Sequence, residues 1–108
     1  MRGFAALRRR GDFDAVHRRG NRLSAGPFTI ITRPNAGLSL RLGMSISRRV
    51  GNAVTRNLIR RRIQNAFDTL DAGRLALDLV IIARPEAADL PYSRLEGALA
   101  NALRRLAG

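Results

Sequence analysis

The chain has 108 residues, the usual size of one domain and too short for two well-buried cores. Hydrophobic residues make up 45% of it, enough for a compact core. The formal net charge is +12, from 20 basic residues, all of them arginine, against eight acidic ones. Such a charge on a small domain makes a polyanion the expected partner. The lack of cysteine excludes disulfides and thiolate metal sites, and no apolar run is long enough for a membrane span or a secretory signal, so we expect a cytoplasmic protein.

The first half of the chain predicts one helix followed by two strands. Residues 11–20 carry apolar side chains at helical spacing and end in glycine, which predicts a short helix. Residues 28–33 are rich in β-forming side chains and stop at a proline, so they predict a strand. Residues 40–47 alternate between apolar and small or polar side chains, as a half-buried strand does.

The second half predicts a long helix, a buried strand and a final helix. Residues 53–70 place an apolar stripe along one helix face, formed by Ile59, Ile63, Ala66, Phe67 and Leu70. Residues 78–83 are almost continuously apolar, which indicates a strand covered on both faces. A last helix opens at Pro91 and repeats the apolar stripe. The order α-β-β-α-β-α predicts a single domain over residues 1–108, of the α/β or α+β class, with its helices packed on a sheet.

Six arginines cluster around the start of the long helix: Arg48, Arg49, Arg56, Arg60, Arg61 and Arg62. At about 100° per residue, Arg60 and Arg61 point away from the apolar stripe. Arg56 and Arg62 lie on its two flanks. No acidic residue occurs between Arg48 and Asp68, although like charges four residues apart on a helix repel each other. We therefore expect this face to bind nucleic acid rather than to remain simply solvated.

Asn52 stands directly before the long helix and is a suitable N-cap residue. The free backbone N–H groups at the helix start, together with Arg48 and Arg49, can form a cradle for a phosphate. The alternative is a capped helix beside a solvated pair of charges, and for Asn52 alone this alternative is favoured.

Residues 41–61 resemble the signature of the bacterial ribonuclease P protein family. That signature is a strand ending in a basic pair (48–49), then Val-Gly-Asn-Ala-Val (50–54), then a helix that opens with Arg-Asn (56–57) and continues with basic residues. The likeness extends over nearly the whole chain, through weaker matches at residues 12–20, 78–85 and 90–92.

The resemblance implies a two-layer α/β sandwich of the ribosomal protein S5 domain 2-like type, with a left-handed βαβ crossover. It also implies the protein subunit of ribonuclease P, the endoribonuclease that removes the 5′ leader from precursor tRNA. In that particle the RNA subunit supplies catalysis and, with the substrate, holds Mg²⁺. The protein alone would bind no metal or other cofactor, would have no catalytic residue and no membrane partner, and would join one RNA.

The resemblance also assigns residues to two binding surfaces. Binding of the catalytic RNA falls to Arg48, Arg49, Asn52, Arg56, Asn57, Arg60 and Arg61. Binding of the precursor-tRNA leader, in a cleft between the sheet and the first helix, falls to Phe13, His17 and Ile31. For Phe13 and Ile31 packing in the core is an equal alternative, and His17 can be an ordinary polar surface residue. Leu58 and Gln64 stand where family members commonly have arginine, so the RNA contact is expected to be weaker or shifted.

Two other functions share this charge and size. A small ribosomal protein would co-sediment with ribosomal subunits, and a DNA-binding module would prefer duplex DNA to structured RNA. The residues themselves give no support for a protein-only enzyme: His17 is the only histidine, the eight acids are scattered, and Gly51 belongs to no phosphate-binding loop.

Overall fold

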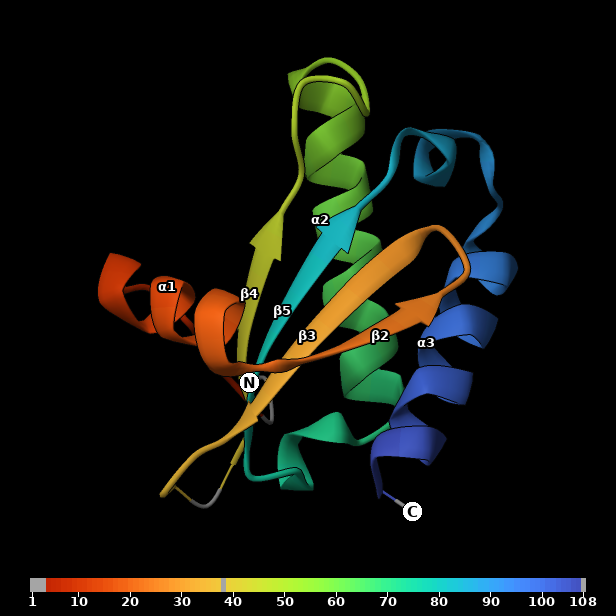
Figure 1. Cartoon of the computed structure of the whole chain (residues 1–108). Helices are drawn as coiled ribbons and strands as arrows, with labels where there is room; N and C mark the ends of the chain where they lie inside the picture. The colour runs from red at the N-terminus through yellow and green to blue at the C-terminus, as the bar shows by residue number, and fades with distance from the viewer. Residues whose placement is uncertain (1–3, 38, 108) are drawn as a thin grey trace.

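The computed structural model describes residues 4–37 and 39–107, and within them a five-stranded sheet carries three α-helices and two short 3-10 helices (Figure 1). In chain order the elements are β1 (Ala5–Ala6), α1 (Arg10–Arg19), β2 (Asn21–Ala25), β3 (Phe28–Pro34), β4 (Arg41–Ser45), α2 (Ala53–Thr69), η1 (Ala72–Arg74), β5 (Leu77–Ala83), η2 (Pro85–Asp89) and α3 (Tyr92–Ala107). No helix within these residues is both long and apolar enough to cross a membrane.

The sheet has the strand order β1-β4-β5-β3-β2, so β5 is inserted between two strands that precede it in the chain. β4 and β5 are parallel neighbours joined through α2, whereas β3 is antiparallel to β5. In Figure 1 β4 and β5 both run upward, α2 lies behind the sheet, and β5 lies to the right of β4. This connection is a left-handed crossover, a rare hand for parallel strands, and it confirms the fold that the family resemblance implied.

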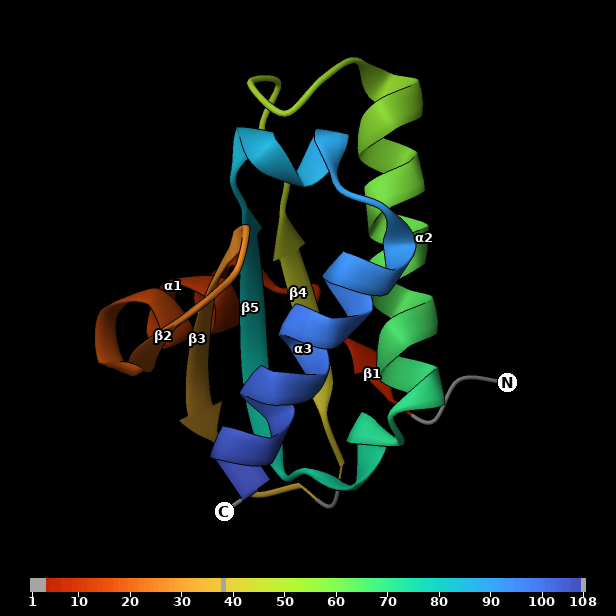
Figure 2. The ribbon, with the colours of Figure 1, turned by 90° about the vertical axis from the view of Figure 1, so that its right-hand side faces the viewer.

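Helices cover both faces of the sheet to different extents. Figure 2 shows α1 on one side and α2 on the other. α2 and α3 enclose the main core, in which Phe28, Phe67 and Leu99 are fully buried. A smaller cluster lies under α1 and contains Val16, Ile31 and Val80. β5 is therefore covered on both faces, as its continuous apolar sequence predicts.

The six elements expected from sequence are all present in the expected order, and the apolar stripes of both long helices are buried. Two strands were not expected. β1 is only two residues long and pairs with β4 at one edge of the sheet. β2 pairs with β3 at the other edge, and only Leu23 and Ala25 of its five side chains turn towards the main core. Because these edge strands contain so few apolar residues, the sequence shows no clear alternation of apolar and polar side chains there.

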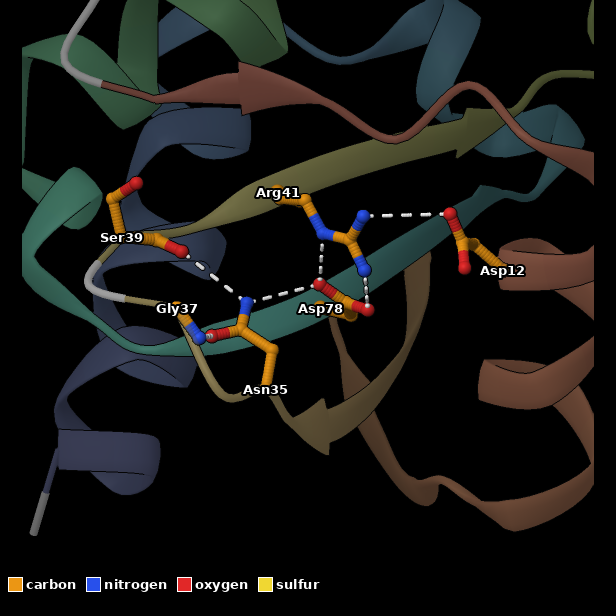
Figure 3. Close-up of polar contacts among 6 residues, drawn as sticks. All are labelled: Asp12, Asn35, Gly37, Ser39, Arg41 and Asp78. Carbon is orange, nitrogen blue, oxygen red and sulfur yellow. Dashed lines mark hydrogen bonds and ion pairs between the residues drawn. The ribbon is translucent and has the colours of Figure 1, made fainter.

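A cluster of polar side chains ties the start of α1 to the middle of the sheet (Figure 3). Arg41 on β4 donates through Nε and Nη2 to the two carboxylate oxygens of Asp78 on β5, at 2.7 and 2.6 Å. Its Nη1 lies 3.4 Å from Asp12 Oδ2 on α1, and Asn35 Nδ2 donates to Asp78 Oδ1 at 2.9 Å. Burial alone would raise the pKa of Asp78, but the hydrogen bonds from Arg41 and Asn35 hold it below its ordinary value.

α1 is also fixed by a close approach of Phe13 to the sheet. A Cβ atom placed on Gly43 of β4 would lie only 2.5 Å from Cζ of Phe13 and 2.7 Å from Cε1. The aromatic ring therefore occupies the space that any other residue at position 43 would fill. Gly43 is needed here because of this contact, and not because of its backbone angles.

We predict that Asp78→Asn lowers the free energy of unfolding by about 2 kcal/mol at pH 7, since it replaces two charge-assisted hydrogen bonds in a buried setting. The pKa of Asp78 is lowered by folding, so the stabilisation exists above the unfolded pKa, near 3.9, and is lost as pH falls through the folded value. Denaturant unfolding of both proteins at pH 7 and at about pH 2 measures this. The difference in the free energy of unfolding between the wild type and Asp78→Asn should be smaller at the lower pH.

Asp71→Asn is the matched control, because Asp71 pairs with Arg74 on the surface, where both side chains are largely exposed. Asparagine also tolerates the left-handed backbone of this position, where φ is 54°. Equal losses of stability for the two variants would contradict the role given to Asp78.

We predict that Gly43→Ala destabilises the protein by about 1–3 kcal/mol, because the added methyl group displaces the Phe13 ring. Thermal unfolding of Gly43→Ala, Phe13→Leu and the double variant measures the coupling between the two positions. The smaller side chain at position 13 should relieve part of the penalty, so strictly additive effects would count against the contact.

Candidate nucleic-acid interface

The start of α2 is shaped by its cap. Asn52 Oδ1 accepts a hydrogen bond from the backbone N–H of Thr55 at 2.9 Å, and Asn52 O accepts one from the N–H of Arg56. The cap confirms the N-cap expectation for Asn52, whose side chain is otherwise exposed. Just upstream, Arg48 and Arg49 are exposed in a turn that is anchored by the buried side chain of Val50.

The expected RNA-binding residues lie together on this turn and on the outer side of α2. We call this set the arginine face; its members are Arg48, Arg49, Asn52, Arg56, Asn57, Arg60 and Arg61. Arg61 is exposed, and Arg60 Nη1 donates to Asn57 Oδ1 at 2.8 Å one turn earlier. Arg56 lies on the flank of the buried stripe, where its Nε is buried and finds no hydrogen-bond partner among the described residues.

Charge balance distinguishes the arginine face from the rest of the surface. Within residues 4–37 and 39–107, Arg41 and Arg74 form ion pairs with carboxylates, but no arginine from Arg48 to Arg62 does so. Arg62 lies on the other flank of α2, and its Nη1 is 3.4 Å from the backbone oxygen of Leu90. The face thus carries uncompensated positive charge beside a positive helix end, which suits a polyanion.

The three residues expected to contact a leader differ in their exposure to solvent. Phe13 and His17 lie one turn apart on α1 and are both partly exposed. Ile31, by contrast, is 0% exposed and packs in the small core under α1. Its side chain has no surface to offer a leader, so the expectation for Ile31 is corrected: it supports α1 from below.

A row of side chains crosses the sheet beside α1, and the sequence did not indicate it. Its members are in register across four strands: Ser24, Thr29, Ile82 and Ser45. They alternate with residues of the main core, so they lie on the α1 side, and all four are exposed or partly exposed. Arg84 donates to the hydroxyls of Ser24 and Thr29, at 2.8 and 3.2 Å. We call these four residues and Arg84 the sheet row.

Potential metal ligands are scattered in the described part of the chain. No three side chains of His, Cys, Asp or Glu gather there in a way that could hold an ion. Asp12 and Asp78 both form ion pairs with Arg41.

Comparison with known proteins gives a consistent result. The family model described as Ribonuclease P matches residues 1–107. The ribonuclease P protein component of Staphylococcus carnosus is 34% identical over 99 residues, covering 91% of this chain and 86% of that protein. The corresponding protein of Shouchella clausii is 36% identical over 101 residues, covering 92% and 83%.

Solved structures agree with the sequence relatives. The RNase P protein of Staphylococcus aureus superposes with a TM-score of 0.84 at 30% identity, covering 94% of each chain. The RNase P protein of Thermotoga maritima gives a TM-score of 0.84 at 27% identity, with 93% and 96% covered. Fold, basic surface and sequence therefore lead to one conclusion: this chain belongs to the ribonuclease P protein family and is a protein component of the endoribonuclease that processes the 5′ end of tRNA.

Proposed function

We propose that this protein binds the catalytic RNA of ribonuclease P through the arginine face and the 5′ leader of precursor tRNA through α1 and the sheet row. The observation that carries the proposal is the run of arginines from Arg48 to Arg62, none of which pairs with a carboxylate within the described residues. Phosphate groups of a folded RNA would supply the missing negative charge.

The protein's contribution to the reaction is positioning and charge neutralisation. The RNA subunit performs the cleavage, and Mg²⁺ is held by that RNA and the substrate. Guanidinium groups near the junction of the two RNAs reduce the repulsion between their backbones, which lowers the magnesium concentration that assembly needs.

The leader surface combines stacking with polar contacts. Phe13 is partly exposed, and aromatic rings can stack on a base of any kind. His17 lies one turn further along α1, and the hydroxyls of the sheet row provide hydrogen bonds to a single strand. One protein joins one RNA, and the particle acts in the bacterial cytoplasm.

We expect the purified protein to accelerate removal of the leader when it is added to the ribonuclease P RNA of the same genome at low magnesium. The RNA and a precursor tRNA are transcribed in vitro, and the cleavage rate is followed with and without protein. The gain should shrink as magnesium rises, because Mg²⁺ then screens the same phosphates. If the protein leaves the rate unchanged at low magnesium, the proposal fails.

We expect Arg61→Ala to weaken binding to that RNA while the melting temperature stays the same, because Arg61 is exposed and unpaired among the described residues. With about six phosphate contacts, the plot of log K against log salt should have a slope of roughly −4 to −5, and losing one contact should reduce it by about 0.7–0.9. Arg74→Ala is the control, since Arg74 already pairs with Asp71 beyond the other end of α2. An equal effect of the two variants would refute the assignment.

A further inference from the structure

Two apolar side chains stand out on the surface of α2. Val54 is 77% exposed and Leu58 is 37% exposed, and no other large hydrophobic residue in the described part of the chain is as open to solvent. They are four residues apart on one helix, so they are direct neighbours. Isolated exposed hydrophobic residues are common on proteins, but these two form a pair, and the pair lies beside the arginine face.

The helical positions place this pair beside the arginines. Measured around the helix from the buried Ile59, Val54 and Leu58 lie at roughly 220° and 260°, and Arg61 lies at about 200°. Val54 and Arg61 lie opposite the buried stripe, and Leu58 lies next to them on the flank of the helix, so all three are exposed on neighbouring positions. Whatever covers Leu58 must therefore also lie close to the guanidinium group of Arg61.

The surrounding charge decides what that partner is. A second copy of this chain also carries a net charge of +12 and would bring arginine against arginine. A membrane surface requires a wider apolar face than two side chains. A paired RNA backbone satisfies the arginines but leaves the two apolar side chains facing phosphate and water. An unpaired nucleotide offers both chemistries, since its phosphate is anionic and its base has an apolar face.

We propose that Val54 and Leu58 pack against an unpaired base of the RNA that the arginine face binds. The inference rests on the proposed function and adds a base contact to an interface otherwise made of phosphate contacts. Phosphate contacts fix position but do not distinguish one RNA from another. The Val54–Leu58 pair then selects RNA that presents a free base at this place over RNA that is fully paired.

Base packing and phosphate contact differ in their response to salt, which gives a direct test. Affinities are measured across a salt series for the ribonuclease P RNA of the same genome and for a fully paired RNA duplex. The variants are Leu58→Ala and Val54→Ala, which keep a good helix former at each position. Asn101→Ala, at an exposed polar position on α3, is the control for surface truncation. Chemical probing of the bases of the ribonuclease P RNA, alone and bound to the wild type or to each variant, locates the contact.

We expect each apolar variant to bind the ribonuclease P RNA about fivefold more weakly, with an unchanged salt slope, because apolar burial is lost and no counterion is involved. The apolar variants should bind the duplex as tightly as the wild type does. Asn101→Ala should bind both RNAs with wild-type affinity. A few unpaired bases should lose their protection in Leu58→Ala.

Three results overturn the inference while leaving the proposed function intact: unchanged affinity for the ribonuclease P RNA, an equal loss on the duplex, or a wild-type dimer that Leu58→Ala dissociates in sedimentation analysis. Failure of the wild-type protein to bind the ribonuclease P RNA at all refutes the proposed function, and the inference falls with it.

Discussion

The packing of α2 on the sheet is the constraint from which the binding surface follows. Ile59, Ile63 and Phe67 are buried against the strands, and this burial fixes the rotation of the helix about its own axis. Because a helix turns about 100° per residue, the side chains between the buried ones must face solvent. The arginines are thus directed outward by hydrophobic burial, and their mutual repulsion is tolerated because that burial outweighs it.

The left-handed connection through α2 determines how the two surfaces are related. It inserts β5 between β3 and β4, so that Asp78 can reach Arg41 on one neighbour and Asn35 after the other. The same ion pair extends to Asp12 and holds α1 on the face of the sheet opposite α2 (Figures 2 and 3). One buried carboxylate therefore links the helix proposed to meet the leader with the sheet that carries the arginine-bearing helix.

The two surfaces approach each other where β4 ends. Ser45, the sheet-row residue at the end of β4, is only three positions before Arg48, the first residue of the arginine face. An RNA bound along α2 and a single strand bound along the sheet would come close at this corner. A rigid sheet with a capped helix beside it keeps both sets of groups at a fixed separation, which is what a positioning subunit requires.

The sequence by itself determined the periodic part of this protein. Helical and alternating patterns predicted the six main elements, the buried stripes and the outward arginines, because each depends on spacing along one segment. Tertiary structure alone decided the rest: β1 and β2, the burial of Ile31, the sheet row, and the ion pairs of Arg41. These depend on which strands become neighbours. The left hand of the crossover was expected only from the family resemblance, since the general rule for parallel strands favours a right-handed connection. Pairing between distant segments leaves no periodic mark in a sequence, so only the folded chain reveals it.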